Sequence, residues 1–104
     1  MVVVRGRGWE IENVDDVREY AREHGYDLTS EDLDGICLDS EALILIDASL
    51  TGCHRLEIEI HELLHAYDPD IPERRVRILG RTLARALWRL GYRGQPTKQA
   101  PPTI

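Results

Sequence analysis

The sequence predicts a single α+β domain in which a small β-sheet packs on helices. Short apolar runs at 2–4, 9–11 and 35–47 are typical of strands, and apolar residues at helical spacing in 13–24, 53–67 and 73–90 are typical of amphipathic helices. The chain has 104 residues, of which 42% are hydrophobic and 31% charged, so it suits one hydrophobic core. We therefore assign residues 1–93 to one domain and the proline-rich residues 94–104 to a disordered tail.

The first quarter of the chain is expected to form two short strands and a helix. The strands, at 2–4 and 9–11, are separated by Gly6 and Gly8. Asn13 is the expected N-cap of the helix, because two aspartates follow in what would be its first turn, where the helix dipole favours negative charge. Gly25 ends this helix, and its apolar stripe comprises Val14, Val17, Tyr20 and Ala21.

A hairpin is expected after the polar residues 26–34, which have the composition of a loop. Its strands are 35–38 and 42–46, and the turn between them is 39–41. The second strand consists of five consecutive apolar residues, ALILI, a run typical of a strand that is covered on both faces.

Two further helices are expected, from about residue 53 to 67 and from about residue 72 to 90. Pro69 and Pro72 interrupt the helical pattern between them, and Gly91 ends the second helix. Gly80 lies inside that helix at a cost of about 1 kcal/mol relative to Ala, so we expect it to allow close approach to another element. The expected core stripes are Leu56, Ile60, Leu63, Leu64 and Tyr67 in the first helix, and Val76, Leu79, Leu83, Ala86, Leu87 and Leu90 in the second.

The net charge of −6 hides a division between two parts of the chain. Residues 1–72 carry a net charge of −13, whereas residues 73–93 carry +6 because seven arginines lie there. We expect these arginines to form a solvated helix face or to meet an acidic partner surface, and the division makes a homo-oligomer formed through opposite faces a testable prediction. Nucleic-acid binding is less favoured, because no aromatic residues are interleaved with the arginines.

The cytoplasm is the expected cellular environment. Cys37 and Cys53 are too few for a disulfide scaffold, so free thiols in a reducing compartment are favoured over a disulfide between them. The first twelve residues lack the pattern of a signal peptide. No apolar run approaches the roughly 18–20 residues that span a bilayer, so we expect no contact with a membrane.

The segment HELLH at 61–65 is the motif that predicts chemistry. His61 and His65 are four residues apart, so on a helix their imidazoles project from one face and can reach a single Zn²⁺ at about 2.0–2.1 Å. Glu62 lies about 100° further round the helix, where it can act as general base on a water molecule whose pKa the metal has lowered. The alternative is that both histidines are solvated residues of an amphipathic helix.

A catalytic zinc site needs a third protein ligand. The metzincin continuation is excluded, because it requires Gly at position 68 and His at position 71, and the chain has neither. The nearby oxygen donors are Glu73, Asp70 and Asp68. Glu73 is favoured because it opens the next helix, where a short turn can fold it back, whereas the two aspartates suit the turn around Pro69. A donor elsewhere in the chain stays open as an alternative.

The segment LEIEIHELLHAYDPDIPERRVRILGRTLARALWRLGYR resembles small zinc-peptidase-like proteins found in bacteriophages and prophages. In that group an apolar strand and a loop lead into HExxH, an acidic turn with proline follows, and the next helix opens with Glu and ends in a Leu-Trp-x-Leu-Gly-Tyr type sequence. More broadly, the chain is similar to gluzincin-type metallopeptidases, including the ImmA/IrrE family. The resemblance covers about residues 43–93 and implies a minimal zincin-like fold, with His61, His65 and Glu73 as zinc ligands and Glu62 as general base.

The expected function is zinc-dependent hydrolysis of a peptide bond in a peptide or protein substrate, with Zn²⁺ as cofactor and Glu62 as the proton carrier. The resemblance further implies that an exposed strand edge holds the substrate as an added strand. A second interpretation is a non-catalytic zinc-binding module that acts through its arginine-rich helix on a protein or a nucleic acid. A fourth protein ligand would favour the module, and an open coordination position would favour the enzyme.

Overall fold

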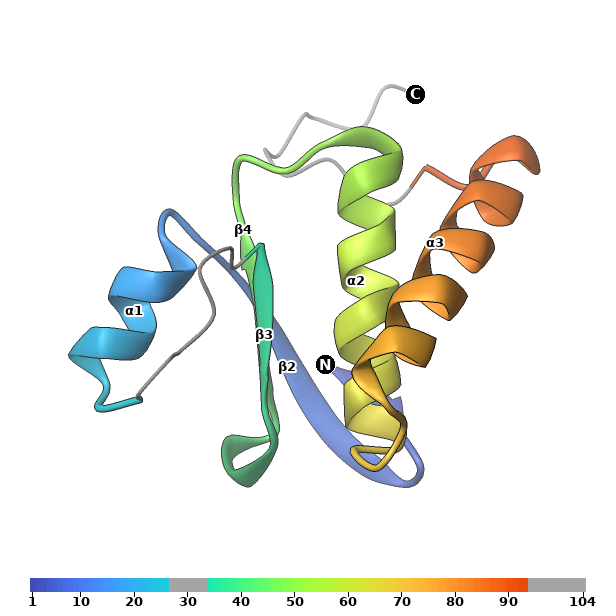
Figure 1. Ribbon diagram of the computed structural model, residues 1–104. Coiled ribbons are helices and arrows are strands. Elements are labelled where there is room, and N and C mark those ends of the chain that lie inside the picture. Colours follow the sequence, from blue (N-terminus) through green and yellow to red (C-terminus); the bar gives the residue numbers. More distant parts are fainter. Residues whose placement is uncertain (27–33, 94–104) are drawn as a thin grey trace.

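The computed structural model describes residues 1–26 and 34–93. Its four strands form one sheet in the order β1-β2-β4-β3, in which β2 and β4 are parallel and the other pairs antiparallel (Figure 1). The prediction of an α+β fold with a small sheet and three helices is therefore confirmed. The elements are β1 (Val2–Val4), β2 (Arg7–Val14), α1 (Val17–Glu23), β3 (Gly35–Leu38), the 3-10 turn η1 (Asp39–Glu41), β4 (Leu43–Asp47), α2 (Gly52–Tyr67) and α3 (Glu73–Arg89).

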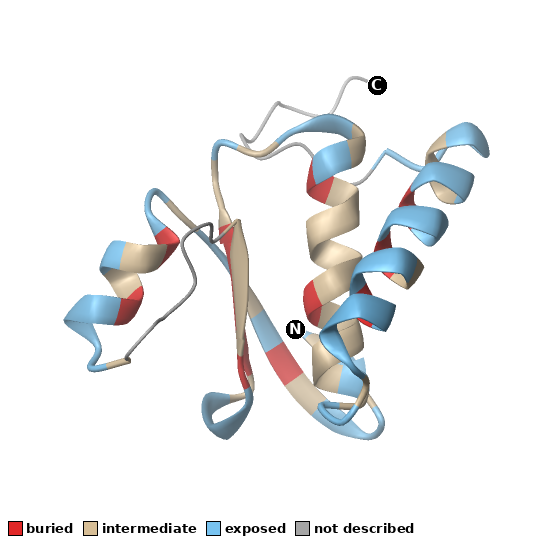
Figure 2. Ribbon diagram, in the orientation of Figure 1, coloured by how far each residue is buried: buried red, intermediate tan, exposed pale blue. Residues whose placement is uncertain are grey.

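The sheet is covered on both faces, by α1 on one side and by α2 on the other, and α3 lies on the outer side of α2 (Figure 1). Strand β4 is the centre of this arrangement. Leu43 and Leu45 pack in the cluster on the α1 side, whereas Ile44 and Ile46 pack in the cluster on the α2 side, and all four are buried (Figure 2). The prediction of an apolar strand covered on both faces is confirmed.

Two predicted segments fall outside this description. The polar loop predicted at 26–34, except for its two end residues, and the tail predicted at 94–104 lie outside the described residues. None of the helices in the described ranges is long and apolar enough to cross a membrane. Cys37 and Cys53 are free thiols and are both half-buried.

The boundary between β2 and α1 differs from the prediction. The expected cap at Asn13 is wrong, because β2 continues through Val14, which pairs with Asp47 at the end of a parallel ladder. This long-range pairing outweighs the local helix signal. Asp16 is the N-cap instead, and its carboxylate accepts a hydrogen bond of 3.0 Å from the backbone N–H of Glu19.

Helix α3 approaches α2 closely at Gly80, as predicted. A Cβ atom added at Gly80 would lie 3.5 Å from the carbonyl oxygen of Glu57 and 3.6 Å from the backbone nitrogen of His61, both on α2. The side of α3 that faces α2 is a row of residues four apart, Val76, Gly80 and Ala84, all of them buried. The small side chains of this row let the two helices come together.

This row also explains where the predicted core stripes are wrong. Leu83 of α3 and Leu90, the residue after its end, are 43% and 74% exposed, and Ala86 is exposed as well. The contact through Gly80 and Ala84 turns these residues away from α2. On α2 the predicted stripe residue Tyr67 is 53% exposed, and the guanidinium of Arg5 lies 5.5 Å from the centre of its ring.

Two glycine substitutions test these packing assignments. Gly80→Ala places its Cβ at ordinary contact distance, so we expect it to raise the free energy of unfolding by up to about 1 kcal/mol through helix propensity. Gly35→Ala places its Cβ 2.9 Å from Ile58 Cγ2 and 3.1 Å from the backbone oxygen of Leu45, so it should destabilise by about 1–3 kcal/mol. Urea unfolding of both variants measures the difference, and a shift in the same direction for both would contradict the packing described.

Candidate metal centre

The last two turns of α2 present two histidines on one side of the helix. His61 and His65 have side chains that are 16% and 25% exposed, and their Nε2 atoms lie 3.2 Å apart. The rings meet edge to face, with centroids 4.9 Å apart. The four-residue spacing therefore brings the same nitrogen of each ring to one point, as the sequence predicted.

A short turn over residues 68–72 reverses the chain between α2 and α3. The backbone N–H of Asp68 donates to the carbonyl of Leu64 at 3.0 Å and ends α2. The carboxylate of Asp68 accepts a 3.0 Å hydrogen bond from the backbone N–H of Asp70. Pro72 then opens α3, and its carbonyl accepts from Val76 at 3.0 Å. Asp68 and Asp70 thus serve the turn, as the sequence favoured.

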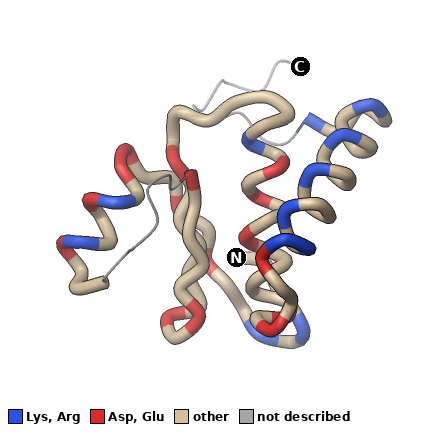
Figure 3. Tube along the Cα trace, viewed as in Figure 1, with Lys and Arg blue, Asp and Glu red and all other residues tan. Residues whose placement is uncertain are grey.

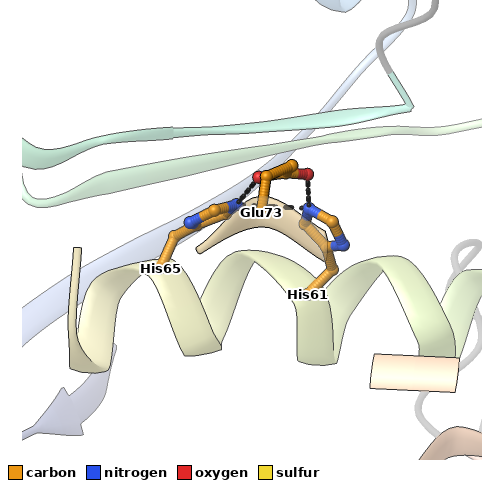
Figure 4. Close-up of side chains that lie close together, drawn as sticks. All are labelled: His61, His65 and Glu73. Atoms are coloured by element: carbon orange, nitrogen blue, oxygen red, sulfur yellow. Dashed lines mark hydrogen bonds and ion pairs between the residues drawn. The ribbon is translucent and has the colours of Figure 1, made fainter. Parts of the chain in front are cut away.

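The turn places Glu73, the first residue of α3, directly against the two histidines (Figure 4). One carboxylate oxygen lies 2.9 Å from Nε2 of His61, and the other lies 2.9 Å from Nε2 of His65. Of the three candidates for a third ligand, the structure brings Glu73 to the histidines and leaves Asp68 and Asp70 outside the group. Among the described residues this is the one group of three side chains whose donor atoms could hold a metal, all within 4.8 Å of one another.

Hydrogen bonding to Glu73 leaves one unfavourable contact in this arrangement, the short distance between the two histidine nitrogens. Each Nε2 would have to donate a hydrogen to a Glu73 oxygen, yet the two nitrogens lie 3.2 Å apart, where two donors repel. A divalent cation removes the conflict, because both imidazoles then direct lone pairs at the cation and the carboxylate becomes a ligand. Atoms that bind tetrahedral zinc at about 2.0–2.1 Å lie roughly 3.3 Å from one another, close to the 3.2 Å between the two histidine nitrogens.

The charge state of His61 also suits a metal. Burial lowers the pKa of His61, although the neighbouring Glu73 carboxylate acts in the opposite direction. The ring is therefore held toward its neutral form, which is the form that binds a metal.

Glu62 lies on the side of α2 that faces Gly35 of β3. It is 6% exposed, and its Cγ is 3.1 Å from the position that a Cβ of residue 35 would take, at the start of β3. Burial, and then the charge of Glu73, raise the pKa of Glu62 to about 8. Glu62 follows His61 directly in the chain and is not among the three side chains whose donor atoms lie together.

Two supports of the site were missed by sequence reasoning. Gly35 leaves the space that Glu62 occupies, and a glycine at the start of a predicted strand is a signal for such a close approach. Arg55 is buried in the first turns of α2, where its guanidinium donates to the side-chain oxygen of Asn13 and to the carbonyl of Asp47 at 3.4 Å. These bonds tie α2 to the ends of β2 and β4, and no local pattern signals them.

Comparisons of the chain with protein-family models, with curated proteins and with solved structures found no match. A metal centre is therefore inferred from this chain's own residues and from the geometry in which the fold places them. The class of site that they define is a potential two-histidine, one-carboxylate centre with a buried second carboxylate beside it.

Removing single donors tests the ligand assignment. We expect the wild-type protein to bind one Zn²⁺ per chain, and His61→Ala or Glu73→Ala to weaken binding by more than about 100-fold, since losing even an outer hydrogen-bond partner of a zinc ligand costs about 10–100-fold. Asp70→Ala is the matched control, because Asp70 is a carboxylate of the adjoining turn and should leave affinity unchanged. Competition with a chelating dye measures the constants, and an equal loss for Asp70→Ala and Glu73→Ala would contradict the assignment.

The raised pKa of Glu62 predicts a pH-dependent stability in metal-free protein. Because its pKa is about 8 in the folded chain and 4.5 is the ordinary value, the protonated carboxyl favours folding below pH 4.5, and this contribution is lost as the pH rises through about 8. Glu62→Gln should therefore gain stability over wild type across this interval, by at most about 5 kcal/mol. Urea unfolding in chelator at several pH values measures the gain, and a difference that does not change with pH would be the contrary result.

Proposed function

We propose that this chain is a minimal zincin-like zinc peptidase that hydrolyses peptide bonds in an extended polypeptide. The observation that carries the proposal is the convergence of His61, His65 and Glu73, with their donor atoms within 4.8 Å, beside the buried carboxylate of Glu62. Catalytic zinc sites use three protein ligands of these types, whereas structural sites use four. The three-residue group in the described part of the chain therefore supports an enzyme over a non-catalytic zinc-binding module.

Zinc held by these three residues would polarise the scissile carbonyl and lower the pKa of a water molecule to about 7. Glu62 would take one proton from the attacking water as its oxygen adds to the carbonyl carbon. It would then deliver that proton to the amide nitrogen as the C–N bond breaks, so that one water is consumed and a carboxyl and an amine product form. A base with a pKa near the working pH is best suited to both transfers.

Strand β3 is the proposed support for the substrate. It forms an edge of the described sheet, where its one partner is β4, and it packs beside α2. Gly35 and Cys37 face α2, and burial raises the pKa of the Cys37 thiol to about 12, so that this thiol stays neutral beside Glu62. A peptide added to the free edge would pass Glu62 and the histidines and would be held mainly by backbone hydrogen bonds.

The role of Glu62 can be separated from metal binding. Zinc-loaded Glu62→Gln should keep the full metal content yet lose cleavage of a peptide library by about 10²–10⁴-fold, because the proton carrier is gone. Glu12→Gln, an exposed carboxylate on β2, is the matched control and should cleave like wild type. Mass spectrometry of new peptide termini measures the rates. Unchanged cleavage by Glu62→Gln would remove it as the base, and absence of any wild-type cleavage with full zinc would favour the binding module.

A further inference from the structure

Helix α3 presents a strongly basic surface beside the proposed site. Figure 3 shows basic residues along α3, whereas acidic residues gather at the ends of the strands and on α2, and α1 carries residues of both charges. In the two described ranges, one ion pair links these arginines to an acid of the chain, the contact of 3.9 Å between Arg81 Nε and Glu57 Oε2. The exposed arginines of α3 are Arg74, Arg75, Arg77, Arg81, Arg85 and Arg89.

Two of these arginines lie on the same side of α3 as the ligand Glu73. Arg77 and Arg81 follow Glu73 at intervals of four residues, so they lie about 40° and about 80° from Glu73 round the helix. The contact between Arg81 and Glu57 agrees with this placement, since Glu57 precedes His61 by one turn on α2. Glu73, Arg77 and Arg81 thus form a row on α3 that starts at the proposed site. It runs antiparallel to a row on α2 formed by Glu57, His61 and His65.

The direction of the elements determines which part of a substrate would meet this row. Helix α2 runs in the direction of β3, and α3 runs back in the opposite direction (Figure 1). A peptide paired antiparallel with β3, the slightly more stable pairing, therefore runs in the direction of α3. After it passes the site, its C-terminal part therefore runs in the direction in which Arg77 and Arg81 follow Glu73 along α3.

The spacing along the helix gives approximate positions. Arg77 and Arg81 lie about 6 Å and 12 Å beyond Glu73 along the axis of α3. An extended peptide advances about 3.3 Å per residue, so these distances correspond to about two and four residues of substrate. Arginine is the side chain best suited to carboxylates, because its planar fork can form two parallel hydrogen bonds with one of them.

We propose that Arg77 and Arg81 bind acidic side chains of the substrate, about two to four residues C-terminal to the bond that is cleaved. This inference rests on the proposed peptidase function and adds the class of its substrate, a polypeptide with an acidic segment downstream of the cleavage site. A carboxylate partner fits better than a nucleic acid, because the net charge of −6 and the acidic surfaces elsewhere would repel an extended polyanion. A short acidic segment of a peptide would contact only the arginine row and would not reach the acidic surfaces that repel a longer polyanion.

The first test is the cleavage profile of wild-type protein on a random peptide library. We expect Asp and Glu to be enriched two to four residues after the cleaved bond. Enrichment before the bond, or no acidic preference, would overturn the inference while leaving the peptidase function intact. Absence of cleavage would instead overturn the proposed function on which the inference rests.

The second test is a binding measurement on zinc-loaded Glu62→Gln protein, read by fluorescence anisotropy of a labelled library-derived peptide. A peptide with Glu at the second and fourth downstream positions should bind about tenfold more tightly than the same peptide with Gln there, and Arg77→Gln/Arg81→Gln should abolish the difference. Arg75→Gln/Arg89→Gln removes the same charge from another side of α3, about 80–160° further round the helix, and should leave the difference within about twofold.

Two outcomes of the binding test would contradict the proposal. Equal losses for both double variants would indicate general attraction of negative charge rather than a row at the site. Displacement of the peptide by an equimolar single-stranded oligonucleotide would indicate a nucleic-acid surface. Arg77→Glu/Arg81→Glu provides a further check, since it should favour the same peptide with Lys at the two positions, and failure to do so would count against direct pairing.

Discussion

The close approach of α3 to α2 is the constraint on which the proposed site depends. Gly80 and Ala84 have small side chains, so the backbones of the two helices lie close together. The turn over residues 68–72 that connects the helices is short. Together they place the first residue of α3 over the last two turns of α2. Glu73 therefore reaches both histidines from an otherwise exposed position, and a side chain longer than that of alanine at Gly80 would push the two helices apart.

The sheet supplies the second half of the arrangement. Arg55 ties α2 to the ends of β2 and β4, and Gly35 gives Glu62 room between the helix and the edge strand. The same tight packing that buries Glu62 raises its pKa, so the position of the carboxylate and its chemistry have one cause. Residues that build the fold thus also set the properties of the groups proposed to react.

The features predicted correctly from the sequence are those that local patterns determine. Helix α2, helix α3 and the β3–β4 hairpin follow from periodicity and from turn residues, and the meeting of His61 and His65 follows from their spacing alone. Long-range contacts account for the errors. Parallel pairing with β4 keeps Val14 in a strand, and the small-residue row on α3 leaves Leu83 exposed. The burial of Glu62 against Gly35 brings together residues far apart in the chain. A glycine at the start of a strand indicates a close approach there, but the sequence does not show which residue approaches it.

A crystal structure of the zinc-soaked protein, with anomalous scattering recorded at the zinc edge, tests the central claim most directly. We expect one strong peak in the anomalous map, at about 2.0–2.1 Å from Nε2 of His61, Nε2 of His65 and an oxygen of Glu73, with the fourth coordination position open to water. A peak bound elsewhere, or one from which Glu73 is absent, would contradict the site described. A fourth protein side chain at the metal would keep the site and contradict the proposed peptidase.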